Sequence, residues 1–177
     1  MLTISFFLVA LSLVALGAVT LGGRLPSQHV ASVKAHYAAS PDTLWALVSD
    51  PLGAAAWRKD LVEVARVASS DGVLRWRERS KRRAIEFEAL PSVVGRRFTT
   101  RMTQDDLPFA GQWDYELSSD GTGTVLVITE RGTIRSPLFR VLARYIVGYT
   151  HSLESYHRSL AARLGEQPPI VVLQNGR

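Results

Sequence analysis

The sequence predicts an α+β domain in which a curved antiparallel sheet of about seven strands wraps around one long C-terminal helix. Between Leu61 and Arg135, short segments of strand-like residues alternate with turn residues, and the spacing is too short for helical crossovers. The segment from Pro137 to Leu164 carries an apolar stripe at helical spacing, which needs a broad apolar surface to cover it. The stripe consists of Leu138, Leu142, Tyr145, Tyr149, Leu153, Tyr156 and Leu160. A sheet that buries this stripe has to curl around the helix.

The chain of 177 residues has room for one domain plus an appendage. It contains no cysteine, which excludes disulfides, thiolate nucleophiles and cysteine-ligated metals. The net charge of +5 is carried almost wholly by arginine. Such a balance is typical of nucleic-acid binding, of contact with an anionic membrane or simply of a soluble surface, and the distribution of the charges has to decide.

Residues 1–23 form an apolar segment in which Leu2 to Gly23 carries no charge. As a helix this segment would span about 33 Å, enough to cross a hydrocarbon core of about 30 Å. The alternative is a cleaved signal peptide, but there is no basic residue before the apolar run, and the run is longer than such peptides need. We therefore expect a transmembrane anchor and a single-pass membrane protein. Arg24 and Lys34 follow the span, so the positive-inside rule places the folded domain in the cytoplasm.

A short linker over residues 24–28 precedes the predicted domain, residues 29–165. Val30 to Ala39 alternates with the period of a half-buried strand. Ser40 then suits the N-cap of a short helix and Pro41 its first position, and Asp50-Pro51 ends that helix. A second short helical piece is expected over Leu52 to Trp57.

Six further strands are predicted between these short helices and the long terminal helix. They cover Val62–Ala68, Val73–Ser80, Ala84–Leu90, Arg97–Thr103, Gln112–Ser118 and Thr124–Ile134. Ser136 and Pro137 then open the terminal helix, Gly148 interrupts its pattern and Gly165 closes it. Residues 166–177 form a tail whose order the sequence does not determine.

Several short motifs, in this order and spacing, resemble the SRPBCC superfamily, which is the START-like, helix-grip group. They are Ala39-Ser40-Pro41, Leu44-Trp45-Ala46-Leu47-Val48-Ser49-Asp50, Trp57, Asp120-Gly121-Thr122-Gly123-Thr124 and the long terminal helix. The match is most similar to the polyketide cyclase/dehydrase-type branch. The resemblance implies a helix-grip fold with a cavity for a hydrophobic ligand between sheet and helix. We expect no cofactor.

Three functions follow from these expectations. The first is a membrane-anchored binder or carrier of a hydrophobic small molecule or lipid. The second is a cyclase- or dehydratase-like enzyme that uses an inward carboxylate. The third is an interaction module without a ligand, which a cavity filled by its own side chains would favour.

The hairpin from Val73 to Leu90 accounts for much of the arginine. If Lys81-Arg82 is a two-residue turn, Arg77 faces Glu86 and Arg75 faces Glu88 across the strands. Several cations stay unpaired in this scheme and are available to anionic lipid headgroups, namely Arg79, Lys81, Arg82, Arg83, Arg96 and Arg97. Because no aromatic residues interleave with exposed arginines, nucleic-acid binding is not expected.

Large apolar and aromatic side chains on the facing surfaces of sheet and helix are the candidate lining of a ligand pocket. They are Trp76, Phe87, Trp113, Tyr115, Leu142, Tyr145 and Tyr149. Each of them could equally be ordinary core. Buried tyrosine hydroxyls need partners, which favours a partly polar cavity.

Glu78 and Glu130 are the weak candidates for catalytic groups. An inward carboxyl in an apolar cavity has a raised pKa and can act as a general acid or base. The simpler expectation is that each lies near water or pairs with an arginine, Arg131 or Arg135 in the case of Glu130. The four histidines do not have the spacing of a metal site, with His29 and His36 at the start of the domain and His151 and His157 on the terminal helix.

Overall fold

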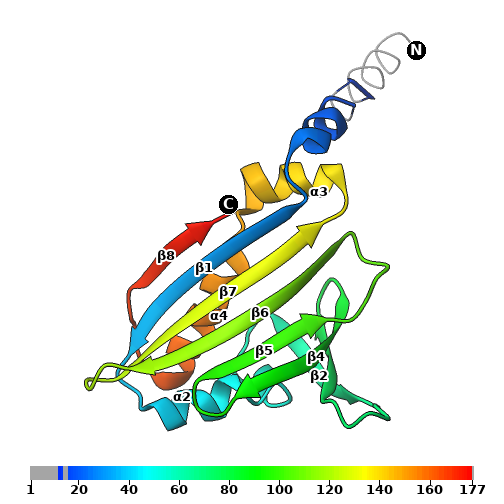
Figure 1. Cartoon of the computed structure of the whole chain (residues 1–177). Coiled ribbons are helices and arrows are strands. Elements are labelled where there is room, and N and C mark those ends of the chain that lie inside the picture. The colour runs from blue at the N-terminus through cyan, green and yellow to red at the C-terminus, as the bar shows by residue number, and fades with distance from the viewer. Residues whose placement is uncertain (1–11, 14–15, 177) are drawn as a thin grey trace.

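The alternating segments of the chain form one antiparallel sheet, and the computed structural model describes it over residues 12–13 and 16–176. The sheet has eight strands in the order β2-β3-β4-β5-β6-β7-β1-β8 (Figure 1). The strands are β1 (Gln28–Tyr37), β2 (Leu61–Val67), β3 (Arg75–Ser80), β4 (Ala84–Val93), β5 (Arg97–Met102), β6 (Phe109–Ser119), β7 (Thr124–Ile134) and β8 (Ile170–Asn175). The predicted fold class is confirmed.

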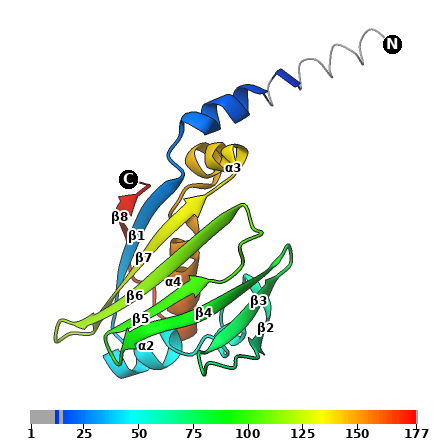
Figure 2. The same cartoon turned by 45° about the vertical axis from the view of Figure 1, so that its right-hand side comes forward.

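The terminal helix α4 (His151–Leu164) lies on the concave face of this sheet and packs against β1 and β7 (Figures 1 and 2). Its buried side chains meet inward residues of the sheet in one core. Fully buried members of this core are Val33, Tyr37, Leu44, Trp76, Leu126, Ile128, Leu153 and Leu160. No described residue before Ala31 belongs to this core cluster, so the core is built from the domain alone.

The short helix α2 (Pro41–Val48) begins as its sequence predicts. The Ser40 hydroxyl accepts a hydrogen bond from the backbone N–H of Thr43 at 3.3 Å, and Pro41 occupies the first turn. The second helical piece is shorter than expected and consists of the 3-10 turn η1 (Ala54–Ala56).

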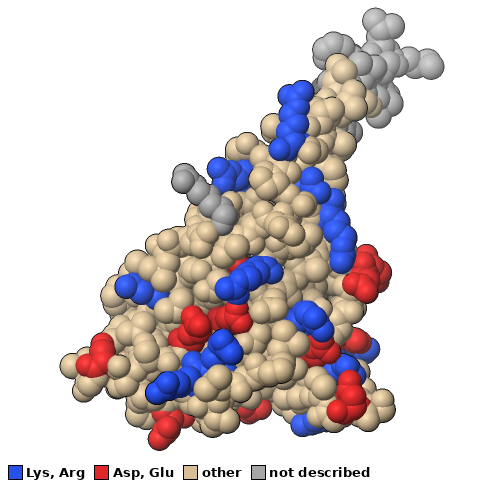
Figure 3. Space-filling view, viewed as in Figure 1, with Lys and Arg blue, Asp and Glu red and all other residues tan. Residues whose placement is uncertain are grey.

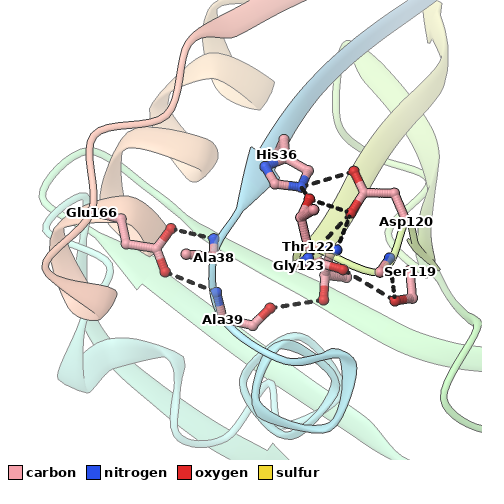
Figure 4. Close-up of polar contacts among 10 residues, drawn as sticks. His36, Ala38, Ala39, Ser119, Asp120, Thr122, Gly123 and Glu166 are labelled. Carbon is pink, nitrogen blue, oxygen red and sulfur yellow. Dashed lines mark hydrogen bonds and ion pairs between the residues drawn. The ribbon is translucent and has the colours of Figure 1, made fainter.

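The lower end of the molecule is fixed by side chains that bond backbone groups (Figure 4). Just beyond α4, the Glu166 carboxylate accepts hydrogen bonds from the backbone N–H groups of Ala38 at 2.8 Å and Ala39 at 3.1 Å. The carbonyl of Ala39 accepts one from the Thr124 hydroxyl at 2.8 Å. The chain leaving β1 is thereby bound to both α4 and β7, which holds the helix against the sheet.

The terminal helix is not continuous, which corrects the prediction of one helix from Pro137 to Leu164. It consists of α3 (Pro137–Leu142), a π-helical turn η2 (Ala143–Val147) and α4. Gly148 separates η2 from α4 with a φ of +83°, a conformation that favours glycine. The 100° spacing of the apolar stripe is therefore lost between residues 142 and 151.

The two ends of the chain differ in how far the structure describes them. Part of the predicted tail forms β8, which adds to the edge of the sheet by pairing with β1. Most of the predicted transmembrane segment, residues 1–23, lies outside the described residues, although a helix covers 16–24. Within the described part of the chain, no helix combines the length and the apolar character needed to cross a membrane.

Candidate ligand-binding cavity

A cavity of about 660 Å³ lies between the concave face of the sheet and the segment from α3 to α4. Its wall is mainly apolar and aromatic, and charged groups lie at only a few points. The large apolar side chains in the wall include Trp57, Trp76, Phe87, Phe98, Trp113, Ile128 and Leu153. A concave, largely apolar space with a few polar groups has the character of a small-molecule site.

The structure brings most of the predicted pocket residues together. Trp76, Phe87, Trp113, Tyr115, Leu142 and Tyr149 all line the cavity. Tyr145 does not, since it is 61% exposed and lies outside the cavity wall, so its prediction is wrong. The reason is the π-helical turn and the Gly148 break, which rotate residue 145 away from the face that α4 turns to the sheet.

Aromatic rings form a continuous wall across three strands. The rings of Trp76 on β3 and Phe87 on β4 stack with their centroids 5.7 Å apart. Phe87 meets Trp113 on β6 edge to face, also at 5.7 Å. Stacked and edge-to-face pairs at these distances are favourable beyond their buried area, so the three rings stabilise one another within the wall.

Glu78 on β3 is held in the cavity wall by an ion pair with Arg58, a residue between η1 and β2. The Nη1 of Arg58 donates to Oε2 of Glu78 at 2.9 Å, and the side chains are only 17% and 13% exposed. The indole N–H of Trp76 donates to Oε1 of Glu78 at 3.1 Å. Glu78 therefore points inward, and the expectation that it pairs with an arginine is also met.

Arg58 is further fixed by Asp60, to which Nε and Nη2 both donate, at 3.3 and 2.7 Å. Burial disfavours the charge on Arg58, but the carboxylates of Glu78 and Asp60 outweigh burial and raise the pKa of Arg58 above its ordinary value. The guanidinium also lies 5.6 Å from the centroid of the Tyr156 ring. A permanent positive charge thus lies in the cavity wall.

Two tyrosines beside this ion pair, Tyr115 on β6 and Tyr156 on α4, have their rings 5.2 Å apart. Burial raises the pKa of both phenols well above the ordinary value. Both therefore stay neutral in the physiological pH range, where a phenol can donate a hydrogen bond to a ligand oxygen.

Glu130 on β7 forms a second polar cluster in the same wall. Its carboxylate accepts hydrogen bonds from His29 Nε2 at 3.2 Å, Trp113 Nε1 at 3.0 Å and the Ser152 hydroxyl at 3.2 Å. The expected pairing with Arg131 or Arg135 is wrong. Arg131 bonds Asp114 and Arg135 pairs with Asp105, because both arginines belong to other surfaces than the inward Glu130.

His29 is a cavity residue that the sequence analysis does not predict, since it places His29 only at the start of the domain. It is 8% exposed and lines the cavity, with its ring stacked on Tyr149 at 4.5 Å. Gly132 makes room for it, since a Cβ at that position would lie 2.1 Å from the imidazole. The period-two pattern of the first strand, extended back from Val33 and Ala31, would have placed His29 on the inward face.

The Nδ1 atom of His29 is buried and has no hydrogen-bond partner within the described part of the chain. A carboxylate can only accept, so Nε2 carries the hydrogen toward Glu130, and Nδ1 of a neutral ring is then an acceptor. An unpaired buried polar atom costs free energy. A ligand hydroxyl or a water that reached Nδ1 would relieve that cost.

The convex face of the sheet carries the paired charges that the hairpin pattern predicts. Arg75 lies opposite Glu88 and Arg77 opposite Glu86 in the observed register. Their ion pairs measure 3.2 and 2.5 Å. Arg79 is paired as well, with Glu63 at 2.8 Å, which corrects the expectation that it is free. Figure 3 shows acidic and basic side chains interspersed on this face, unlike a nucleic-acid surface.

The chain is similar to known proteins in both sequence and fold. The family model described as polyketide cyclase/dehydrase and lipid transport matches residues 28–162. A START superfamily protein from Mycobacterium smegmatis has a similar structure, with 19% identity and a TM-score of 0.62 over 77% of this chain and 97% of that one. The structure of the Zhui aromatase/cyclase from Streptomyces sp. R1128 is similar as well, with 14% identity and a TM-score of 0.57. The match covers 78% of this chain and 90% of that one.

The norcoclaurine synthase from Thalictrum flavum is also similar, with 13% identity and a TM-score of 0.59 over 79% of this chain and 88% of that one. No curated protein matches the sequence. At these identities the solved structures establish the shared helix-grip fold, and the family resemblance of the motifs is confirmed by the family model.

Proposed function

Since the chain belongs to the polyketide cyclase/dehydrase and lipid transport family, we propose that it binds and carries a hydrophobic small molecule or lipid. The main support for this proposal is the cavity of about 660 Å³ with its aromatic wall. A cavity of this size is within the range of small-molecule sites. We further propose that the apolar residues 1–23 anchor the carrier in a membrane, with the domain in the cytoplasm.

The polar groups of the cavity support binding rather than turnover. The Glu78 carboxylate is engaged by Arg58 and Trp76, and the Glu130 carboxylate by three donors. Groups held in this way orient a ligand oxygen without needing to exchange protons. The open volume speaks against a ligand-free interaction module, whose core would be filled.

Ala143→Trp is expected to weaken ligand binding at least about tenfold, or about 1.4 kcal/mol. Ala143 lines the cavity from η2, so an indole there occupies space that the ligand needs. The fluorescence of 1-anilinonaphthalene-8-sulfonate, titrated with each variant, measures the change. Arg144→Trp is the matched control, because Arg144 is the next residue, is exposed and does not line the cavity. Equal binding by both variants would contradict the assignment of this cavity.

A cyclase- or dehydratase-like enzyme is the second candidate, and the His29–Glu130 pair in the cavity wall favours it. The histidine and carboxylate together could transfer a proton, with a neutral Tyr115 donating to a carbonyl. Glu130→Gln and Glu78→Gln separate the two functions through turnover, because both variants keep their affinity for the dye under either function. If the protein is an enzyme, the unmodified chain converts a bound substrate and the variants do not, whereas a carrier releases the bound molecule unchanged in all three forms.

A further inference from the structure

We propose that the end of the molecule formed by α3, η2 and the β3–β4 hairpin lies on the surface of an anionic lipid bilayer, with the cavity mouth opening into it. This inference rests on the proposed function, because it assigns the route by which a membrane-derived ligand enters the same cavity. Three independent features of this end carry it.

The first feature is a patch of exposed apolar side chains on α3 and η2. Ile146 is 73% exposed, and the patch also contains Leu138, Phe139, Tyr145 and Val147. Phe139 and Val147 belong to the cavity wall as well. Leu138, Tyr145 and Ile146 do not line the cavity, so the same short segment that contributes to the cavity wall also presents apolar side chains to the exterior. A group of exposed apolar side chains of this kind marks an interaction site.

The second feature is the position of the N-terminal segment. A Cβ on Gly22 would lie 2.0 Å from the carbonyl oxygen of Pro137, the first residue of α3. Arg140 of α3 donates through Nη1 to the carbonyls of Gly22 and Leu25, at 3.3 Å each. The uncharged run of residues 2–23 thus ends in contact with α3 (Figures 1 and 2). If that run crosses a bilayer, the bilayer surface has to lie at α3.

The third feature is positive charge at the tip of the β3–β4 hairpin, where Arg82 and Arg83 also line the cavity. The hairpin tip Lys81-Arg82-Arg83 is exposed, and the ion pairs found within residues 16–176 include none of these three cations. Arg83 lies 5.0 Å from the centroid of the Phe109 ring, which in turn lies 6.5 Å from that of Phe139. These contacts bring the hairpin tip close to α3.

The figures agree with this arrangement. Figure 2 shows the β3–β4 hairpin rising toward the end of the molecule where α3 lies. In Figure 3, the side chains of lysine and arginine flank the base of the N-terminal segment on the visible face, whereas the acidic ones lie lower. The negative surface potential of an anionic leaflet attracts basic residues that lie near it. A second copy of the chain is a poorer occupant, because a two-fold interface here would bring two basic hairpin tips together.

The absence of cysteine allows a direct test with single labels. Full-length chains with Ile146→Cys, Leu16→Cys or Val94→Cys are labelled with a nitrobenzoxadiazole dye and reconstituted into nanodiscs. The discs contain phosphatidylcholine, phosphatidylglycerol and a spin-labelled quenching lipid. Leu16 belongs to the N-terminal apolar run, and Val94 is an apolar control at the β4–β5 turn, 83% exposed.

We expect the labels at residues 16 and 146 to lose most of their fluorescence to the quencher, and the label at 94 to keep it. In discs of phosphatidylcholine alone, quenching at 146 decreases. We expect the combined variant Lys81→Gln, Arg82→Gln, Arg83→Gln to show this decreased quenching at 146 in both kinds of disc. The variant lacks the three positive charges that the anionic lipid attracts.

Quenching at 16 but not at 146 would overturn the docking surface and leave the anchor in place. Quenching at neither position would overturn both. Dye binding by the cavity, measured with 1-anilinonaphthalene-8-sulfonate on the unlabelled chain without lipid, tests the carrier function separately. A variant that binds the dye normally but shows no quenching at 146 therefore refutes only the bilayer contact.

Discussion

Replacing Arg58 with methionine is expected to lower the free energy of unfolding by about 3–5 kcal/mol, because the change leaves the Glu78 carboxylate buried without its partner. Glu78 is held between Arg58 and the Trp76 indole in the cavity wall. Its remaining donor is a neutral N–H, which cannot compensate a charge. Urea denaturation, monitored by tryptophan fluorescence, measures the loss.

Arg79→Met is the matched control for this change. Arg79 pairs with Glu63 across the β2–β3 ladder, but the two side chains are 51% and 54% exposed. Exposed pairs contribute about 0–1 kcal/mol, so the control loses little stability. The double change Arg58→Met with Glu78→Gln should recover part of the loss, because the stranded charge is removed. Similar losses in Arg58→Met and Arg79→Met would show that the Glu78 site is open to water.

Lowering the pH from 6.5 to 4.5 is expected to cost about 2 kcal/mol of stability through His157 alone. His157 on α4 is fully buried, and burial lowers its pKa to about 4, although its hydrogen bond to the Val33 carbonyl acts in the opposite direction. The unfolded chain protonates this histidine near pH 6.5. Between these values the unfolded state binds more protons, so the free energy of unfolding falls as the pH falls.

The contacts of His157 fix its neutral form. Nε2 donates to the Val33 carbonyl at 3.3 Å, which leaves Nδ1 to accept from the Tyr37 hydroxyl at 2.9 Å. Urea denaturation at a series of pH values is the measurement. His157→Gln should flatten the dependence above pH 4.5, whereas His151→Gln, exposed on the same helix, should leave it unchanged. An equally steep dependence in His157→Gln would assign the effect to other groups.

Local patterns predict the parts of the fold that local chemistry determines. The Lys81-Arg82 turn gives the register of the β3–β4 hairpin residue for residue, because a two-residue turn leaves one way to pair the strands. Ser40 and Pro41 place the start of α2 for a similar reason, since cap and ring geometry act within one turn. The alternation of apolar side chains predicts which residues of β3, β4 and β6 form the cavity wall.

Features that depend on distant partners could not be predicted in the same way. β8 forms because the edge of β1 is open, and nothing within Ile170–Asn175 reveals that edge. His29 reaches Glu130 because β1 pairs with β7 and Gly132 leaves space for the ring. A spacing of 100° per residue assigns Tyr145 to the pocket, because it takes no account of the π-helical turn and the positive φ at Gly148.

The most direct test of the carrier function is native mass spectrometry of residues 25–177, which contain the whole core cluster, purified without detergent. We predict a mass above that of the polypeptide, and the release on denaturation of one discrete hydrophobic species small enough for a cavity of about 660 Å³. Ala143→Trp should lack that species, whereas Arg144→Trp should retain it. A polypeptide that has no bound species, and acquires none after incubation with membrane lipid extract, would contradict the proposal that this protein carries a lipid.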